Sequence, residues 1–476
     1  MLQLFKKQST LVLSQLLSLS IVFILSSCKQ TANKESTSSF FAEPLILNVK
    51  DYGAKGDSLT LDTKALQAAI DASATKGGGT VRIPRGKYIT GTLYLKSNIT
   101  LSLEKGAYLY GSHDINDYPT EGHADIEGFD QALLYAQDAT DITIEGLGTI
   151  DGRGYPHIFP QKIKGQKERP LRPQLLIFVN CQHLRFSSTT FTNPAFWGLH
   201  LINCTGLHFD AVTIDSKENN PNNDGIDLDG CQEVIIENSK IHAGDDAVCL
   251  KSTTNRPCKN ILVKNCDISS HTAGFKCGTS SKTGFQNIKV IDSWFHDCPM
   301  GAVKLQAVDG GKLENVELSR LVMDRVGGPF FIRLGNRGKQ YEGLYTGNEP
   351  PSIAPKQVGS IKNIQIKDVV AHVSHTTLDR MGIMITGIPN HYIENVTLED
   401  IQISYPGGGT SEHAQRTIAE DIARYPEQFF FGVLPSWGAY IRHAKNITFN
   451  NVNLALQGED QRKKIVTDDV LRFQEN

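Results

Sequence analysis

Nine short units with a common pattern recur along the chain, and their spacing limits the fold more than any other feature. Each unit holds two short segments in which apolar and polar residues alternate, as in CQEVIIENSKI and CKNILVKNCDI. Alternation with a period of two is typical of β-strands rather than helices. A regular period of 20–30 residues in short strands predicts a solenoid. The residues that mark the first six units are His183, Gly206, Glu233, Asn260, Asn287 and Asn315, which are 23, 27, 27, 27 and 28 residues apart.

A right-handed parallel β-helix fits this repeat, which makes the predicted fold class all-β. A leucine-rich repeat would show a leucine consensus with helical segments, and a propeller blade needs four longer strands over about 40 residues. In a β-helix, each turn of the chain adds short strands that stack about 4.8 Å from the turn below. The later markers Asn363, Asn395 and Asn446 follow at gaps of 48, 32 and 51 residues. We therefore expect inserted loops in those gaps.

The same register predicts two columns of cysteines. Such columns are typical of small buried hydrophobic side chains in line, so we expect reduced thiols with a packing role. Neighbouring members would also be close enough for a disulfide to be geometrically conceivable. The first column holds Cys181, Cys204, Cys231 and Cys258, and the second holds Cys249 and Cys277.

The segment 62–79 predicts a helix that caps the open end of the solenoid. Asp62 is the candidate N-cap, and Gly77–Gly79 end the helix. A cap is expected because an uncovered end would expose core residues and strand edges. The three glycines follow a helix and precede a strand, with no GK[ST] sequence, so we interpret them as a turn rather than a phosphate loop. The predicted apolar face is formed by Leu66, Ala69, Ile70 and Ala74.

The N-terminus has the features of a targeting segment. Lys6 and Lys7 precede an apolar stretch over 11–25, and the sequence LSSC ends at Cys28. This order is the secretory pattern, and LSSC also resembles the bacterial lipobox, in which the cysteine is lipidated. The alternative is an ordinary signal peptide with a chance cysteine. We predict a signal peptide with lipobox over 1–28, a flexible Ser/Thr-rich linker over 29–43 and one β-helix catalytic domain over 44–476.

Composition argues against several classes of function. The net charge is −3, whereas a nucleic-acid-binding protein usually carries a basic excess. The cysteine spacing fits neither a small disulfide scaffold nor a zinc CxxC pair. We therefore expect no nucleic-acid partner. We also expect no cofactor, no metal and a monomer.

Two acidic stretches, NNPNNDGIDLDGCQEV and AGDDAVCLKS, predict chemistry. Asp224 and Asp245 are 21 residues apart, close to one coil, so stacking should bring them to the same side of the molecule. Glycoside hydrolysis needs two such carboxyl groups. One is protonated and donates its proton to the leaving oxygen, and the other is ionised and activates water. Their repulsion helps to raise the pKa of one of them. Asp246 can join them only if Gly244 lies at a turn or bulge, because successive strand residues point to opposite faces.

Two other interpretations of the acidic stretches stay open. Clustered aspartates and asparagines bind hard cations, so DGIDLDG could be a calcium loop, although it lacks the spacing and the closing glutamate of an EF-hand. Corners rich in Asn and Asp are also common turns of solenoids.

Several motifs together resemble glycoside hydrolase family 28, the polygalacturonase family. They are DYGAKGD at 51–57, the stretch 77–112, GTIDGRG at 148–154, NNDGID and GDDAVCLKS. The resemblance implies a parallel β-helix that hydrolyses glycosidic bonds with inversion. It implies that Asp245 is the general acid and that Asp224 and Asp246 position and deprotonate the water. Asn222 opens NNDGID, two residues before Asp224, and is a candidate substrate-binding residue.

The sequence departs from the family at two motifs. Where the family carries Gly-His-Gly, Thr272 or Ala273 stands at the position of the histidine, and His271 comes one or two places early. Where the family carries Arg-x-Lys, the candidate counterparts are Lys304 and Gln306. The family residues contact the galacturonate near the cleavage point, so their loss argues against plain polygalacturonan.

A different set of cations could serve an acidic sugar. Our candidate substrate-binding residues are therefore Asn222, Lys276, Lys304, Gln306 and Arg333, with Arg337 as a further cation. The loop 152–174 and the insert after Arg333 could close one end of the groove, which would favour exo cleavage.

We therefore predict an exported, lipid-anchored bacterial glycosidase, periplasmic or at the cell surface, that acts on an acidic polysaccharide such as pectin. The membrane would be contacted only through the lipid anchor. The alternatives are a β-helix polysaccharide lyase and a non-catalytic carbohydrate-binding β-helix protein.

Overall fold

The computed structural model describes residues 45–120, 130–160, 171–216, 221–337, 357–374 and 377–476. The predicted signal peptide, Cys28 and the predicted linker lie outside these residues. Within the described part of the chain, no helix is long and apolar enough to cross a membrane.

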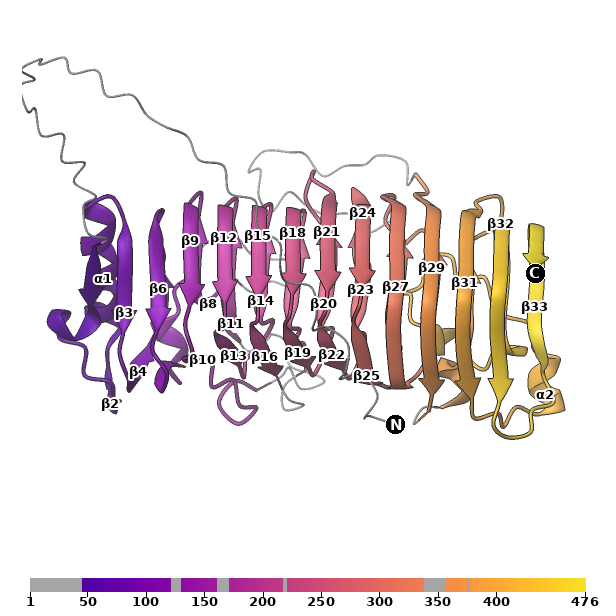
Figure 1. Cartoon of the computed structure of the whole chain (residues 1–476), viewed down its shortest axis with the longest axis horizontal. Helices are drawn as coiled ribbons and strands as arrows, with labels where there is room; N and C mark the ends of the chain where they lie inside the picture. Colours follow the sequence, from indigo (N-terminus) through magenta and orange to yellow (C-terminus); the bar gives the residue numbers. More distant parts are fainter. Residues whose placement is uncertain (1–44, 121–129, 161–170, 217–220, 338–356, 375–376) are drawn as a thin grey trace, which may run out of the picture. The chain divides into compact units, whose positions relative to one another are not determined.

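Among the described residues, thirty-three strands connect through parallel pairing, and consecutive coils stack side by side along one axis (Figure 1). Each coil contributes one strand to each of three ladders, which we call the first, second and third sheets; they join in the long strands near the C-terminus. The first sheet comprises β5 (Leu93–Tyr94), β8 (Ala132–Gln137), β11 (Gln174–Val179), β14 (Leu199–Ile202), β17 (Ile226–Asp229), β20 (Val248–Ser252), β23 (Phe275–Ser281), β26 (Val303–Ala307), β28 (Phe330–Leu334), β30 (Ile383–Thr386) and the start of β32 (Ser436–Leu456).

The second sheet faces the viewer in Figure 1, and the third sheet lies along its lower edge. The second comprises β1 (Ile46–Asn48), β3 (Gly79–Ile83), β6 (Ile99–Leu103), β9 (Thr140–Glu145), β12 (Gln182–Ser187), β15 (Thr205–Asp210), β18 (Gln232–Glu237), β21 (Cys258–Lys264), β24 (Gly284–Ile291), β27 (Lys312–Val326), β29 (Ser360–Val373), β31 (Ile393–Tyr405), β32 and β33 (Lys463–Glu475). The third comprises β2 (Asp57–Leu61), β4 (Gly86–Thr90), β7 (Ala107–Gly111), β10 (Thr149–Asp151), β13 (Thr190–Thr192), β16 (Thr213–Ser216), β19 (Lys240–Ala243), β22 (Asp267–Ser270), β25 (Trp294–Cys298) and the second half of β27.

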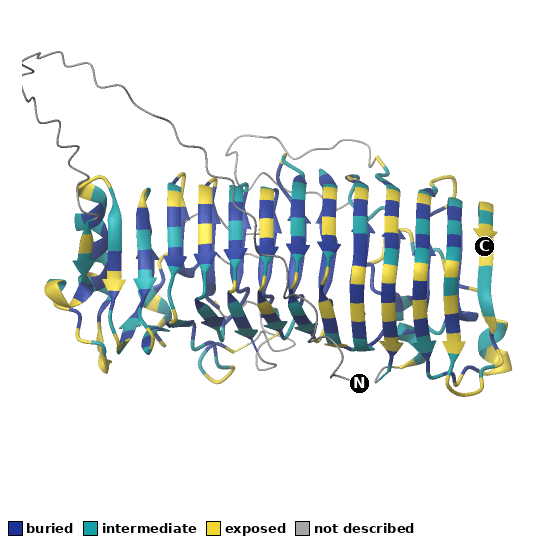
Figure 2. Cartoon of the chain, viewed as in Figure 1, coloured by how far each residue is buried: buried dark blue, intermediate teal, exposed yellow. Residues whose placement is uncertain are grey.

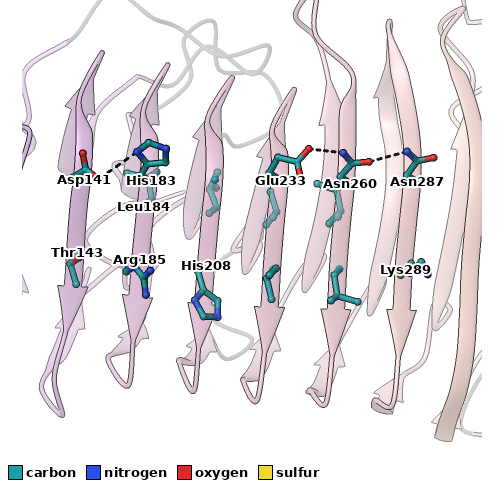
Figure 3. Close-up of a pocket in the computed structure, with 16 residues that line it drawn as sticks. Asp141, Thr143, His183, Leu184, Arg185, His208, Glu233, Asn260, Asn287 and Lys289 are labelled. Carbon is teal, nitrogen blue, oxygen red and sulfur yellow. Dashed lines mark hydrogen bonds and ion pairs between the residues drawn. The ribbon is translucent and has the colours of Figure 1, made fainter.

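The repeat markers occupy one column of left-handed turns in the second sheet. Asn260, Asn287 and Asn315 have φ of 58°, 56° and 61°, a region that asparagine tolerates better than most residues. Asn287 donates its side-chain amide to Asn260 at 2.9 Å, and Asn315 donates to Asn287 at 3.1 Å. The ladder begins at Glu233 (Figure 3) and continues through Asn363, Asn395 and Asn446, which donate over 3.1, 3.0 and 3.0 Å. The column that the sequence predicts is therefore confirmed.

Alternating side chains fill the interior of the coils, which produces the banded burial of the strands in Figure 2. Phe186 and Phe209, on neighbouring strands of the second sheet, stack with ring centroids 4.4 Å apart. Stacking of identical rings in consecutive coils is how a solenoid forms one continuous core from short strands.

The first predicted cysteine column is present, and the second is wrong. Cys181, Cys204, Cys231 and Cys258 are buried free thiols, each within hydrogen-bonding distance of a backbone carbonyl. Cys249 is in register with Lys276, whereas Leu250 is in register with Cys277. Side chains alternate across a strand, so Cys249 points outward and Cys277 inward.

Helix α1 (Thr63–Thr75) lies at the N-terminal end of the row of strands and packs against its first strands (Figure 1). Its buried face includes Leu66, Ala69 and Ile70. Asp62 stands at the N-cap position but makes no side-chain cap bond, which corrects the predicted role. Its carboxylate instead accepts hydrogen bonds from the backbone of Lys55 and Gly56, at 2.7 and 2.9 Å. The all-β, parallel β-helix class with an N-terminal helix is confirmed.

Candidate active site

Stacking of neighbouring coils brings three aspartates together on the outer side of the first sheet. Asp224 precedes β17, and Asp245 and Asp246 lie in the turn between β19 and β20. The backbone of Gly225 donates to Asp246 at 2.9 Å, which sets the register of the two coils. One carboxylate oxygen from each aspartate lies within 4.8 Å of the others.

Gly244 permits the adjacent pair to share this side. A β-carbon at residue 244 would lie 2.4 Å from the side-chain oxygen of Asn223, so only glycine fits there. The chain bends at Gly244 and Asp245 before β20 begins. This bend removes the strand alternation that would otherwise send Asp245 and Asp246 to opposite faces.

Thr272 bridges the adjacent pair. Its hydroxyl lies 2.9 Å from Asp245 Oδ1 and 2.7 Å from Asp246 Oδ1. A hydroxyl carries one proton and can fully satisfy only one ionised carboxylate. The pair is best satisfied when one aspartate is protonated and donates to Thr272, which donates in turn to the other. Thr272 is one of the two residues at which the family histidine was expected, and the sequence did not indicate this bridge.

Electrostatics assigns the proton to Asp245. Burial, and then repulsion from Asp246, raise the pKa of Asp245. Burial also acts to raise the pKa of Asp246, but the positive charges of Lys276, Lys304 and Lys251 outweigh it and hold that pKa below its ordinary value. Lys276 donates to Asp246 Oδ2 at 2.7 Å. The site therefore favours the proton on Asp245 over Asp246, with the two carboxyl groups linked by a hydroxyl.

A buried lysine forms the second layer of the site. Lys251 lies 3.0 Å from Asp227, 3.9 Å from Asp224 and 4.1 Å from the centre of the Trp197 ring. Burial, and then the charge of Asp227, raise the pKa of Asp224 well above its ordinary value. Burial raises the pKa of Asp227 to about 6 against the opposing charge of Lys251. Lys251 was missed in the sequence, although a lysine in the buried strand VCLKS is itself a signal of a paired charge.

These residues border a cleft of about 250 Å³. It is lined by Trp197, Asn222, Asp224, Asp245, Asp246, Lys251, Thr272, Lys276, Thr279, Ser280, Met300, Arg337, Tyr425 and Glu427. Of the five predicted substrate-binding residues, Asn222 and Lys276 therefore line the cleft. The backbone of Asn222 donates to Asp245 Oδ2 at 3.2 Å. His271 is exposed and lies outside this lining.

The segment 406–435, which we call the wall loop, borders the cleft on the side of β26. It joins β31 to β32 and contains α2 (Ser411–Ala414) and the short helix η4 (Gln428–Phe431). Tyr425 and Glu427 are its contributions to the cleft. The gap of 51 residues between the last two markers predicted an insertion here, but not its position over the first sheet.

Lys304 and Gln306 hold the wall loop, which corrects their predicted role in substrate binding. Lys304 pairs with Glu427 at 2.5 Å, and Gln306 donates to the carbonyl of Pro426 at 2.7 Å. Both side chains are fully buried. Their charge and hydrogen-bonding capacity are directed to the loop rather than to the cleft.

Arg333 has the same kind of role, so its predicted contact with substrate is also wrong. Its guanidinium donates to the carbonyls of Glu420 and Asp421 in the wall loop, at 2.7 and 3.1 Å, and to the carbonyl of Gly387 at 3.1 Å. Arg442 supports the loop alongside it through the carbonyl of Ile418 at 2.7 Å. The side chain of Arg333 is only 1% exposed.

A larger groove, of about 680 Å³, lies on the outer face of the second sheet (Figure 3). Its lining includes Asp141, His183 and Lys289 as well as the first members of the marker ladder. Asp141 and His183 pair at 3.4 Å, whereas the other charged side chains are spread along the strands. This surface brings no set of carboxyl groups together, so the chemistry belongs to the cleft.

Comparison with known sequences and structures now places the chain. The family model described as glycosyl hydrolases family 28 matches residues 78–421, and that of rhamnogalacturonase A/epimerase, pectate lyase-like, matches residues 46–108. The chain belongs to glycosyl hydrolase family 28. It is therefore a polygalacturonase-like glycosidase.

Relatives agree with this family at moderate identity. The chain is 28% identical over 375 residues to a probable polygalacturonase of Vitis vinifera, covering 74% of this chain and 73% of the relative. Two solved structures share the fold. The family 28 exopolygalacturonase of Yersinia enterocolitica has a TM-score of 0.68 at 22% identity, covering 91% of this chain and 78% of its own. The exopolygalacturonase of Thermotoga maritima has a TM-score of 0.67 at 20% identity, covering 87% and 93%.

Proposed function

We propose that this family 28 glycosidase removes sugars from the end of a pectic chain, with Asp245 as the general acid. The observation that carries the assignment is the bridge from Asp245 through Thr272 to Asp246 and Lys276. It keeps a proton on Asp245, the member of the pair whose pKa is raised. A general acid must hold its proton near the working pH until the leaving oxygen needs it.

Asp246 is the base in this proposal. Lys276 keeps it ionised, so it can take a proton from a water molecule as that water attacks the anomeric carbon. Asp224 lies on the neighbouring coil and orients the same water. After bond cleavage Asp245 is ionised and Asp246 protonated, and exchange with solvent restores the starting state.

We infer inversion from the family resemblance. The carboxylate oxygens, one from each aspartate, lie within 4.8 Å of one another, closer than the roughly 6.5–9.5 Å carboxyl separation that usually accompanies inversion. Proton NMR of the freshly released sugar distinguishes the two outcomes, because an inverted anomer appears before mutarotation. A product that keeps the anomeric configuration of the substrate contradicts inversion.

The wall loop supports exo cleavage. A polysaccharide running along the first sheet would cross successive coils, and the loop covers β26, β28 and the start of β32 through Lys304, Gln306, Arg333 and Arg442. The open volume of about 250 Å³ is below the roughly 300–1,000 Å³ of typical small-molecule pockets, enough for very few sugar units. The two structural relatives named above are exopolygalacturonases.

The cations of the cleft bear on which sugar is recognised. Lys251, Lys276 and Arg337, the cations among the described cleft residues, pair with Asp227, Asp246 and Asp309. Lys276 also lies 3.8 Å from Glu427, so it is the cation placed between the acid pair and the wall loop. We propose that Lys276 meets the carboxylate of an acidic pectic sugar as well as Asp246.

Purified protein incubated with pectic polysaccharides and oligosaccharides tests this function. We expect release of monosaccharide from the first time points, without ultraviolet absorbance from an unsaturated sugar. Intermediate-length products at early times would contradict exo cleavage, and ultraviolet-absorbing products would indicate a lyase. Asp245→Asn should lower kcat by roughly 10²–10⁴-fold while substrate binding persists. A wild-type protein that binds pectic sugars without turnover would support the non-catalytic alternative.

We also propose that the protein is exported and lipid-anchored at Cys28. The support is the basic, apolar and LSSC order of residues 1–28. In a bacterial host, wild-type protein should partition with membranes and incorporate labelled fatty acid, whereas Cys28→Ala should not be labelled. Unlabelled wild-type protein contradicts the anchor.

A further inference from the structure

Two histidines and an aspartate converge on the outer face of the third sheet, outside the residues that line the cleft. His242, Ser269 and His296 occupy the same register position on β19, β22 and β25. The small side chain of Ser269 leaves space above it, so the two imidazole rings meet with centroids 5.2 Å apart. Asp267, two residues before Ser269, places Oδ1 3.1 Å from His242 Nε2 and 2.8 Å from His296 Nε2.

The protons of His296 indicate what this arrangement can bind. Its Nδ1 lies 2.7 Å from Asp297 Oδ2, and its Nε2 faces Asp267. A neutral imidazole has one N–H and one acceptor nitrogen, and a metal ligand is the neutral form. If Nδ1–H donates to Asp297, the lone pair of Nε2 points to the region where Asp267 Oδ1 and His242 Nε2 also lie. Arg325 donates to both carboxylate oxygens of Asp297 at 2.7 Å and holds it in place.

We propose that His242, Asp267 and His296 bind one zinc ion. Two imidazole nitrogens and a carboxylate oxygen are ligands that zinc prefers, and all three atoms lie within 4.8 Å of one another. Two ligands on a tetrahedral zinc ion are roughly 3.3 Å apart, close to the 3.1 and 2.8 Å contacts of Asp267. Asp297 would be the outer carboxylate that orients a metal-bound histidine.

The ligand set also indicates selectivity. Calcium and magnesium prefer oxygen ligands, and only one of the three residues offers an oxygen. Nickel and copper bind nitrogen-rich sites of this kind as well, so they serve as probes. Bound zinc would link three consecutive coils, and a ligand that binds only the folded state stabilises it.

Trp294 provides a reporter for the site. Trp294 is 42% exposed, and its ring stacks on His296 with centroids 4.2 Å apart. The chain has three tryptophans, so Trp294 contributes a large share of the total fluorescence. A paramagnetic ion bound nearby would quench that share. Trp294→Phe should remove most of the nickel-induced quenching while calorimetric zinc binding is retained.

The test measures zinc binding to the metal-free full-length protein by calorimetry and by the shift in melting temperature. We expect one zinc ion per chain and a raised melting temperature, with no saturable binding of calcium at the same concentrations. His242→Gln combined with His296→Gln should weaken zinc binding at least tenfold, as should Asp267→Asn alone. Asp297→Ala should weaken it by roughly 10–100-fold.

His208→Gln is the matched control. His208 pairs with Glu237 at 2.7 Å on the second sheet, so its loss removes a histidine without touching the proposed ligands. Far-UV circular dichroism shows whether each variant is folded. If the double histidine variant is unfolded, Asp267→Asn provides the test, because it keeps the size and shape of the side chain. Absence of zinc binding by wild type, or equal binding by folded Asp267→Asn and His208→Gln, overturns the proposal.

Discussion

The ammonium group of Lys276 lies 2.7 Å from a carboxylate oxygen of Asp246, and both side chains are almost fully buried. A buried ion pair is strongly destabilised when one partner is removed, because the other charge is left without compensation. Here the pair also divides two adjacent aspartates into an ionised and a protonated member.

Lys276→Met should move the acidic limb of the pH–rate profile to higher pH. The folded-state pKa of Asp246 is lowered by lysine charges that outweigh burial. Without the charge of Lys276, burial raises this pKa, so the base stays protonated to a higher pH. We expect a shift of about one unit or more in the acidic limb of kcat/KM, whereas Lys276→Arg should leave the limb near its wild-type position. An unchanged limb in Lys276→Met would show that Asp246 is not the base.

Thr272→Val should lower kcat more than it raises KM, because it removes the hydroxyl between Asp245 and Asp246 but keeps the shape of the side chain. We expect a loss of roughly 10–100-fold, in line with one or two charge-assisted hydrogen bonds. Thr272→Ser retains the hydroxyl and should recover most of the activity. Equal rates for the valine and serine variants would argue against the bridge.

Asp224→Asn should stabilise the fold at neutral pH while abolishing most activity. The folded-state pKa of Asp224 is raised above its unfolded value of about 4. The contribution of Asp224 to the free energy of unfolding is therefore fully present below pH 4 and is lost as the pH rises towards the folded-state pKa. The melting temperature of Asp224→Asn should therefore exceed that of wild type at pH 7, and the difference should vanish near pH 4.

Asp227→Asn is the contrasting variant. The pKa of Asp227 is also raised, to about 6, so a neutral side chain again gains stability above pH 4. This variant also removes the partner that lies 3.0 Å from buried Lys251, so we expect a smaller rise in melting temperature at pH 7 than for Asp224→Asn. If both variants are stabilised to the same extent, the pairing of Lys251 with Asp227 contributes no stability.

Removal of either partner of the Lys304–Glu427 pair should destabilise the protein by roughly 3–5 kcal/mol. Glu427→Met leaves buried Lys304 unpaired, and Lys304→Met leaves Glu427 with Lys276 alone, at 3.8 Å. The double variant should recover much of the loss. Calorimetric unfolding of the four proteins gives the coupling energy. In the single variants the wall loop should detach, and the products released from oligosaccharides should become longer. Products of unchanged length would show that the wall loop does not determine exo cleavage.

The sequence predicted the features that follow from periodicity. The marker column from Glu233 to Asn446 set the register, and this register alone placed Asp224 on the coil beside Asp245. The same reasoning failed for Cys249 and Cys277, because they are 28 residues apart and the register between β20 and β23 is 27, which pairs Cys249 with Lys276. Asp62 does lie at the start of the helix, but its carboxylate accepts hydrogen bonds from the backbone of Lys55 and Gly56 instead of from the first turn.

The role of outward-facing polar residues depended on chain segments remote in sequence. Lys304 and Gln306 look like substrate contacts if their coil is considered alone. Their partners Glu427 and Pro426 come from a segment about 120 residues later, and no local pattern indicates that it folds back. Thr272 was named only as the replacement for a histidine, since a threonine in a turn is usually unremarkable.

The ladder of side-chain amides from Glu233 to Asn446 makes each coil both a donor to the one before and an acceptor for the one after. An exchange of Asn315 for alanine would therefore leave an acceptor on Asn287 and a donor on Asn363 to solvent at once, so one substitution removes two links between coils. Evolution can lengthen or shorten such a protein by whole turns, since the new ends rejoin the same line of amides. Insertion or deletion of part of a coil would interrupt the ladder. Insertions therefore fit where a segment leaves one coil and joins the next in register, as 406–435 does.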